Sequence, residues 1–380
     1  ALTLSLLGIL GIDTASGDTS GTSGVALSFL AWKQVVFLIV GMLAAVVIAL
    51  PHARLVHPYI APAYTVVVLL LCFLLIAPDS IVPRINGTKG WIPFPGFNVQ
   101  PAELAKIAVT LGVAANLTRR RGPPRVLVAC VLVAIPIGLI ALQPDLGTAA
   151  LFVPALIAML IAVSVDLRKL SLLLLAAVLI APAGWPVLRA HQQERIIALW
   201  DQIQGDRSGE QDINFQSFTA QRLIGAGGID GLGAGPARAL VRYNQLPEAH
   251  NDMVFAVITA RFGLLGALGL LAVYGLWLLG VALTAMTCTD RFARVVCIGL
   301  AAFIAGQAVI NIGMNVGLLP IIGVTLPFVS YGGSSLITCW LMTGIIFNVA
   351  MRRPMKQFSP RADYPERSDR INAHAALASS

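Results

Sequence analysis

Few residues of this chain are ionisable, and the most informative of them lie at the edges of long apolar runs. Glu103 and Lys106 lie three residues apart near the start of such a run, so a helix there places both on one face. Lys106 then lies about 9 Å beyond Gln100, at about 1.5 Å per residue. A helix N-terminus explains Glu103 equally well, because it favours acidic residues, but it does not explain the lysine. An ionisable residue that deep in an apolar run is a functional candidate, so we expect the pair to contact a substrate.

A second carboxylate, Asp145, lies in the sequence QPDLG at residues 143–147, between two apolar runs. Its side chain can cap the helix that follows, and we weigh that role equally with a direct role in a site. Gln143 adds a polar side chain two residues earlier. Both residues are candidates for the same polar site.

A third carboxylate, Asp252, ends the sequence LPEAHND at residues 246–252 and precedes a long apolar run. N-terminal capping is again the simplest alternative. Glu248 and His250 lie beside Asp252 in sequence, and Ser330 opens the polar segment SYGGSS ahead of the last run. This crowding favours a polar site over three separate helix caps.

The composition determines what kind of element can position these residues. The chain has 380 residues, of which 57% are hydrophobic and only 12% charged, whereas soluble domains have about 25% charged residues. A soluble fold is therefore excluded. The five cysteines show no metal-ligand spacing and serve as packing residues. The sequence leaves no room for a separate catalytic domain, so the chemistry must occur on the membrane domain itself.

We predict an all-α integral membrane protein, a bundle of ten transmembrane helices of about 20 residues each. Residues 1–356 form one polytopic domain, and residues 357–380 form a disordered cytoplasmic tail. The first run begins at Ala1, so we expect residues ahead of it. The predicted spans are residues 1–12, 35–50, 59–77, 101–117, 125–142, 147–163, 170–188, 253–283, 295–316 and 331–350.

Loop charges predict the orientation of the bundle. The loops after the second, fourth, sixth and eighth runs, with the start of the tail, contain twelve basic and two acidic residues. Positive residues favour the cytoplasmic side, so both termini are predicted to be cytoplasmic. The net charge of +8 is then explained by the basic residues of the cytoplasmic loops. Nucleic acid is therefore not an expected partner.

One long loop, at about residues 190–250 between the seventh and eighth helices, is predicted to be extracytoplasmic. It contains an amphipathic segment and six glycines between residues 225 and 235. No strand precedes these glycines and no GK[ST] follows them, which argues against a nucleotide-binding loop. Tight turns and close backbone packing are the better interpretation.

A site at the outer ends of the helices has no ATP available, so its substrate must carry an activated bond. Lipid-linked diphosphates do so, and Lys106 and loop arginines such as Arg222 would meet the diphosphate. A carboxylate near a sugar hydroxyl would act as general base. These features predict a polyprenyl-diphosphate glycosyltransferase. A lipid flippase or transporter would need many of the same contacts and remains the alternative.

Five motifs of the chain resemble those of the SEDS (shape, elongation, division and sporulation) family, which includes RodA and FtsW, with RodA the nearer member. They occur in family order over nearly the whole chain. The motifs are QPAELAK at 100–106, QPDLGT at 143–148, LPEAHND at 246–252, the segment 311–320, and PFVSYGGSS at 327–335.

The resemblance implies a peptidoglycan glycosyltransferase that polymerises lipid II outside the bacterial cytoplasmic membrane. It makes Asp252 the catalytic residue and Glu103 and Lys106 a functionally important pair. It also implies a divalent cation, Mg²⁺ or Mn²⁺, with no ligands specified, and a class B penicillin-binding protein as partner. The motifs fit elongation and division equally.

The chain departs from the family pattern after Asp252. Where the family has two consecutive glutamates, this sequence has Ala260 and Arg261. Arg261 would lie about 13 Å from Asp252 along a helix, at about 1.5 Å per residue. Any metal or proton role of the family's acidic pair is therefore not expected at these two positions.

Overall fold

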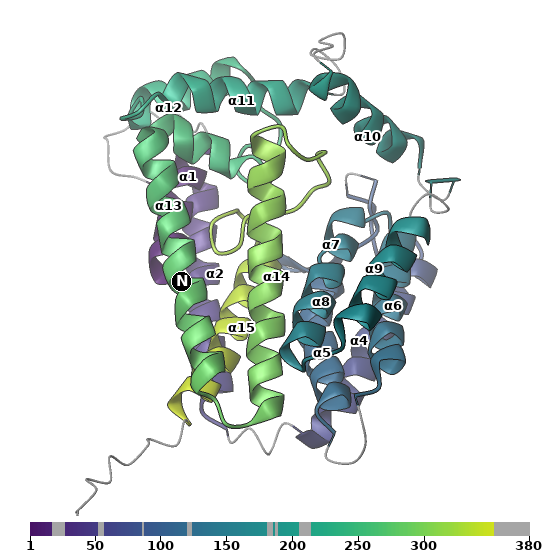
Figure 1. The fold of residues 1–380 in the computed structure, drawn as a ribbon. Helices are drawn as coiled ribbons and strands as arrows, with labels where there is room; N and C mark the ends of the chain where they lie inside the picture. Colours follow the sequence, from purple (N-terminus) through teal and green to yellow (C-terminus); the bar gives the residue numbers. More distant parts are fainter. Residues whose placement is uncertain are drawn as a thin grey trace, which may run out of the picture.

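The computed structural model describes residues 1–16, 27–51, 57–85, 87–119, 124–180, 185–186, 189–204 and 214–352, so the predicted disordered tail at 357–380 lies outside the described residues. The described part is predominantly helical (Figure 1). Its elements are α1 (Leu2–Ala15), α2 (Phe29–Ala49), η1 (His57–Tyr59), α4 (Ile60–Ile76), β1 (Ile92–Phe94), β2 (Phe97–Val99), α5 (Pro101–Leu117), α6 (Val126–Leu142), α7 (Leu146–Ala150), α8 (Phe152–Ala162), α9 (Leu167–Ile180), α10 (Ala190–Ile203), α11 (Phe215–Gly227), α12 (Ala234–Tyr243), α13 (Val254–Thr287), α14 (Arg291–Asn315) and α15 (Gly333–Met351).

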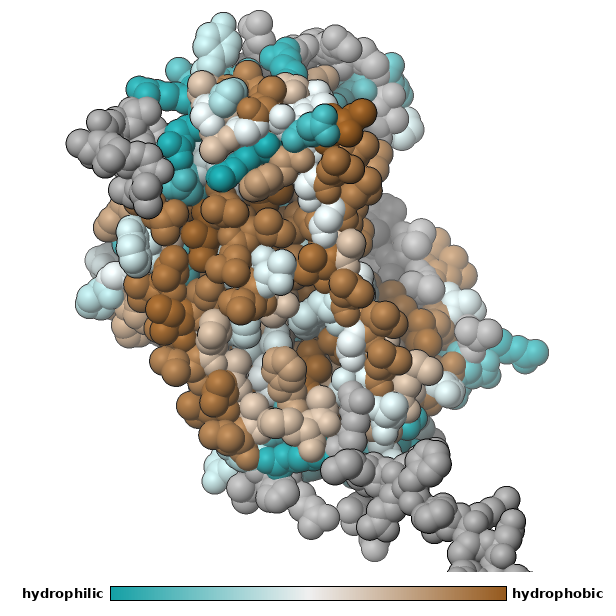
Figure 2. Space-filling model, turned by 90° about the vertical axis from the view of Figure 1, so that its left-hand side faces the viewer, coloured by the Kyte–Doolittle hydropathy of each residue, from teal (hydrophilic) through white to brown (hydrophobic). Residues whose placement is uncertain are grey.

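A helix occupies each of the ten predicted apolar runs, and the prediction of a helical membrane protein is confirmed. Within the described ranges, five helices are long and apolar enough to cross a membrane: α2, α4 with the turn before it, α13, α14 and α15. The number of ten spans stays a prediction. Figure 2 shows a broad hydrophobic band between hydrophilic ends, as expected of a surface that lipid covers. Large apolar side chains such as Leu268 and Leu276 on α13 are exposed.

Helix α14 stands at the centre of the bundle. It packs against α5 and α8 on one side and against α13 and α15 on the other, while α15 packs along α2 (Figure 1). Gly299 permits the close approach of α14 to α5 and α8. A Cβ atom at Gly299 would lie 2.8 Å from both the Met159 Sδ and the Thr110 Cγ2. This glycine therefore lets α14 pack directly against α5 and α8.

The predicted loop at 190–250 contains three helices, α10 to α12, which lie across the top of the bundle in Figure 1. Helices α11 and α12 pack on the start of α13 and form a small hydrophobic cluster separate from the main core. We call this the outer cluster. Its buried residues are Ala220, Leu223, Ala237, Val241, Leu246, Ala249, Met253, Ala256, Val257, Ala260 and Ile321.

Helix α13 is broken at Gly263, which has φ 68° and ψ −167°. The glycine-rich turn enters this break, and the Leu264 N–H donates to the Gly228 carbonyl at 2.9 Å while the Leu232 N–H donates to the Ala260 carbonyl at 2.9 Å. A Cβ atom at Gly231 would lie 2.6 Å from the Gly263 nitrogen. The predicted role in tight turns and close backbone packing is confirmed for Gly227, Gly228, Gly231 and Gly233, whereas Gly225 and Gly235 lie inside α11 and α12.

A short antiparallel hairpin, β1–β2, precedes α5 and was not part of the all-α prediction. The Ser334 Oγ, at the start of α15, donates to the Asn98 carbonyl at 2.6 Å and accepts from the Gln100 N–H at 3.1 Å. These bonds tie the hairpin and the start of α5 to α15. The hairpin therefore has a defined place beside the polar site.

Candidate active site

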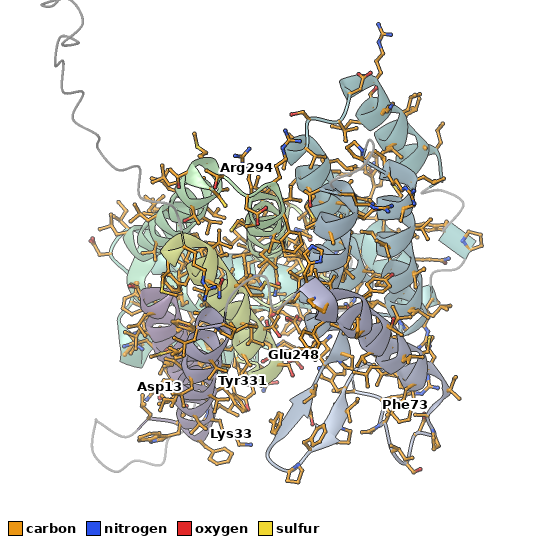
Figure 3. All side chains as sticks on the ribbon, turned by 90° about the horizontal axis from the view of Figure 1, so that it is seen from below. Asp13, Lys33, Phe73, Glu248, Arg294 and Tyr331 are labelled. Atoms are coloured by element: carbon orange, nitrogen blue, oxygen red, sulfur yellow. The ribbon has the colours of Figure 1, made fainter. Side chains whose placement is uncertain are left out.

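A central cavity of about 980 Å³ lies between α5, α14, the hairpin and the outer helix α10. The structure brings four of the predicted site residues together in its wall: Glu103, Lys106, Asp145 and Asp252. Figure 3 shows two further lining residues, Lys33 near the edge of the view and Glu248 nearer its centre. These four predicted residues therefore line one connected space.

Asp252 is held by its backbone. Its carbonyl accepts hydrogen bonds from the Asn311 Nδ2 at 2.8 Å and the Asn315 Nδ2 at 2.9 Å, and both asparagines are fully buried. The Asn315 Oδ1 also accepts from the Ala256 N–H at 3.2 Å, at the start of α13. Two amides of α14 thus fix the position of Asp252 without using its carboxylate.

The carboxylate of Asp252 is available for chemistry. Among the described residues no side chain caps α13, whose N-cap residue is Met253, and none donates a hydrogen bond to the Asp252 carboxylate. Burial raises the pKa of Asp252 to about 7; Glu248 and Asp145 raise it too, while Arg195 lowers it. A carboxylate with a pKa near neutrality suits a general base.

Glu103 and Lys106 form a buried ion pair on one face of α5, as their spacing predicts. The Lys106 Nζ lies 2.7 Å from the Glu103 Oε1 and donates to the Gln307 Oε1 at 2.9 Å. Lys106 is 1% exposed and Glu103 4%. The Gln307 Nε2 in turn donates to the carbonyl and hydroxyl oxygens of Thr325, both at 3.0 Å. Lys106 is therefore built into a polar network at the cavity wall.

Asp145 both caps a helix and lines the cavity. Its Oδ1 accepts from the Thr148 N–H at 2.9 Å, which caps α7, and its Oδ2 accepts from the Gln100 Nε2 at 3.0 Å. Burial raises the pKa of Asp145. Both carboxylate oxygens are thus engaged, unlike those of Asp252.

Two other predicted residues shape the segments around Asp252 and are not among the cavity-lining residues. The Ser330 hydroxyl donates to the Asn251 carbonyl at 2.6 Å. The His250 carbonyl accepts from the Tyr331 N–H at 2.9 Å, and the two rings meet edge to face at 5.6 Å. Burial lowers the pKa of His250. Substrate contact by Ser330 or His250 stays a prediction.

Gln143 and Arg222 also lie apart from the cavity wall. Gln143 is buried, and its Nε2 donates to the Leu71 carbonyl at 3.0 Å, toward α4. Arg222 lies on the exposed side of α11. Their predicted substrate contacts stay predictions.

Arg261 faces helix α1. Its Nη1 donates to the Leu10 carbonyl at 2.9 Å and to the Thr14 Oγ1 at 2.8 Å. Beside it, the Arg238 Nη2 lies 2.7 Å from the Asp13 Oδ2. The Arg261 guanidinium thus links α13, near its break, to the C-terminal end of α1. A helix C-terminus carries partial negative charge, which favours a cation there.

Two features of the site were not predicted from the sequence. One is a row of amide side chains along one face of α14, and the other is an arginine on α10. Gln307, Asn311 and Asn315 recur every four residues, which places them on one helix face. This spacing was a detectable signal. Arg195, which lines the cavity, has no such signal, because it lies in an amphipathic segment of the long loop.

The cavity wall offers carboxylates of the kind that hold Mg²⁺ together with substrate phosphates. In the part of the chain that the structure describes, no three His, Cys, Asp or Glu side chains are grouped as a metal site. Mg²⁺ is commonly held by one or two carboxylates plus substrate phosphates, and Glu248, which lines the cavity, fits this shared arrangement.

The helical bundle and its polar cavity define a polytopic membrane protein with an enzyme-like site. The chain belongs to the FtsW, RodA and SpoVE family of cell cycle proteins, whose family model matches residues 1–354. The predicted SEDS resemblance is thereby confirmed.

Relatives and solved structures agree with this assignment. The chain is 30% identical to "Probable peptidoglycan glycosyltransferase FtsW" of Trichlorobacter lovleyi, over 91% of this chain and 90% of that protein. It is 32% identical to the FtsW of Mycobacterium tuberculosis, with 98% and 70% covered.

Among solved structures, a chain from work on the coordination of polymerization and crosslinking by a peptidoglycan synthase complex has a TM-score of 0.76 at 28% identity, with 93% and 96% covered. The Thermus thermophilus rod shape determining protein RodA has a TM-score of 0.67 at 26% identity, with 93% and 94% covered. FtsW and RodA both match, so the preference for RodA stays a prediction.

Proposed function

We propose that this chain is a peptidoglycan glycosyltransferase that polymerises lipid II into glycan strands on the outer face of the bacterial cytoplasmic membrane. Family membership and the names of its relatives support glycosyl transfer in cell-wall synthesis. The observation that carries the assignment is Asp252, whose backbone is fixed by two buried asparagines while its carboxylate has a pKa near 7 beside a large cavity.

The reaction we propose is a single displacement. The Asp252 carboxylate accepts the proton of the acceptor sugar's C4 hydroxyl as the hydroxyl oxygen attacks the anomeric carbon of the donor. The bond from that carbon to the diphosphate oxygen breaks, and its electron pair leaves with the polyprenyl diphosphate. An α-linked donor gives a β-1,4 product, so inversion requires no covalent sugar–enzyme intermediate.

The Glu103–Lys106 pair and Asp145 support this reaction from the cavity wall. Their mutual hydrogen bonds with Gln307 and Gln100 hold α5, α7 and α14 together beside Asp252. We propose that the same groups contact sugar hydroxyls of lipid II. Preorganised polar groups in such a site stabilise a transition state without reorganisation.

A divalent cation, Mg²⁺ or Mn²⁺, would neutralise charge on the diphosphate leaving group. Glu248 would hold it together with the diphosphate oxygens, which leaves the Asp252 carboxylate free to act as base. Chelation should then reduce polymerisation, and either metal should restore it, with lipid II binding measured in parallel as a readout independent of turnover.

The predicted topology places this site outside the cytoplasm and both termini inside. A class B penicillin-binding protein would then crosslink the strands as they emerge. Similarity to a chain of a peptidoglycan synthase complex supports such a partner. Copurification with candidate penicillin-binding proteins from native cells tests this part of the proposal.

A polymerisation assay with purified protein in detergent distinguishes a glycosyltransferase from a flippase. A detergent micelle has no two membrane sides, so a flippase has no lipid transport to carry out there. With fluorescent lipid II, a glycosyltransferase yields glycan strands that a muramidase digests. A preparation of the Asp252→Asn variant, purified identically, controls for contaminating polymerases. Absence of strands from the wild-type protein, with its penicillin-binding partner present, would favour the flippase.

A further inference from the structure

Arg195 is a cavity-lining cation that the sequence motifs do not include. It lies on α10, and its Nη1 donates to the Ile321 carbonyl at 2.7 Å, which holds the guanidinium against the segment that follows α14. In the described ranges no carboxylate lies within ion-pair distance of Arg195, although it interacts electrostatically with Asp252. Among the residues that the structure describes, its charge is thus positioned without a paired carboxylate.

The cavity needs a cation for an anionic substrate, because its own charges are mostly acidic. Its acidic lining residues are Glu103, Asp145, Glu248 and Asp252. Its basic lining residues are Lys33, Lys106 and Arg195.

The three basic residues are not equivalent. The ammonium of Lys106 is already shared between Glu103 and Gln307. Lys33 lies 4.8 Å from the centre of the Phe29 ring, on the same helix. Arg195 alone combines a cavity position, electrostatic contact with Asp252 and N–H donors beyond the one used by Ile321. A planar guanidinium also matches phosphate oxygens in pairs, which an ammonium does not.

We propose that Arg195 binds the diphosphate of a lipid-linked substrate beside Asp252, and specifically that of the glycosyl donor. The inference rests on the proposed function. As the bond between the anomeric carbon and the diphosphate oxygen breaks, its electron pair adds negative charge to that oxygen, and the guanidinium stabilises this charge while keeping its own protons. The Ile321 carbonyl orients the guanidinium during this step.

The test compares Arg195→Ala, Arg195→Lys and Arg189→Ala in the full chain in nanodiscs. Arg189 is the matched control, since it precedes α10 and its Nη1 donates to the Gly87 carbonyl at 3.3 Å, and neither residue lines the cavity. Loss of a charged hydrogen bond predicts about a 10- to 100-fold lower kcat/KM for Arg195→Ala. Arg195→Lys should recover part of it, and Arg189→Ala should match wild type.

Binding of the polyprenyl diphosphate product identifies the source of the diphosphate. If Arg195 binds the donor, Arg195→Ala should weaken both product inhibition and thermal stabilisation by this compound about 10-fold or more. A raised KM for lipid II with unchanged product inhibition would assign Arg195 to the acceptor's diphosphate instead. Wild-type kinetics and product binding in Arg195→Ala would overturn the proposal.

The binding measurement also separates this inference from the proposed function. Thermal stabilisation by polyprenyl diphosphate needs no turnover, so it reports on Arg195 even if the protein forms no strands. If Arg195→Ala loses thermal stability, the Arg195→Lys variant carries the test, because it keeps a cation on α10. Product binding by Arg195→Lys that is as strong as wild type would then refute the proposal, because an ammonium does not match phosphate oxygens in pairs.

Discussion

Replacing Asp252 with asparagine separates catalysis from structure. The substitution keeps the side-chain shape and leaves untouched the backbone carbonyl that Asn311 and Asn315 hold. No described residue donates a hydrogen bond to the carboxylate, so folding loses no partner. Loss of a positioned general base costs about 10²–10⁴-fold in rate. We therefore expect Asp252→Asn to fold, bind its partner and make almost no glycan strand.

The raised pKa of Asp252 adds a prediction about stability. Burial moves this pKa from 3.8 to about 7, so the folded wild type loses stability as pH rises through that window. Roughly three pKa units at 1.36 kcal/mol each set an upper limit of about 4 kcal/mol. Asparagine does not ionise. Asp252→Asn should consequently be more stable than wild type above pH 7 and equally stable near pH 4.

Two assays measure these effects: polymerisation of fluorescent lipid II by gel, and thermal unfolding in detergent at acidic and alkaline pH. An Asp252→Asn variant that unfolds early at pH 8 would mean that Asp252 is a structural residue. A stable variant with wild-type activity would move the base elsewhere, and Asp145 and Glu103 would be tested next.

Three other outcomes follow from the same geometry. Lys106→Met should lower the free energy of unfolding by about 3–5 kcal/mol, measured by thermal melting, because it leaves a buried carboxylate unpaired. Adding Glu103→Gln should recover most of that stability. No recovery would show that the two residues are not energetically coupled. The kcat/KM for lipid II should rise with pH and level off above about pH 7, where Asp252 is ionised, and a flat profile from pH 5 to 9 would contradict its role as base. In a background without the native cysteines, Tyr243→Cys should react with an impermeant thiol reagent in spheroplasts. Thr289→Cys, in the predicted cytoplasmic connection between α13 and α14, should not react; the reverse pattern would invert the topology.

The positions of the helices could be predicted from the sequence because each is a long apolar run. The i, i+3 pairing of Glu103 and Lys106 followed from helix geometry alone and is confirmed. The break at Gly263 could not be predicted in this way. Glycine is common in membrane helices, and this one adopts a positive φ only because the turn at 228–233 packs into it.

The site could be predicted where a side chain bonds to residues close to it in sequence. It could not be predicted where the bonding partner is distant in sequence. Asp145 caps the helix that it precedes, as expected. Gln143, only two residues away, is directed to the Leu71 carbonyl by packing against α4. Asn311 reaches the Asp252 carbonyl, 59 residues away in sequence. Such partners depend on how the helices pack, which periodicity does not specify.

The outer cluster places two neighbouring residues in different parts of the fold. Met253 belongs to that cluster, together with residues of α11 and α12, whereas the carbonyl of Asp252 is bonded to Asn311 and Asn315 of α14. The hydrogen bonds that position Asp252 therefore do not depend on the packing of the outer helices.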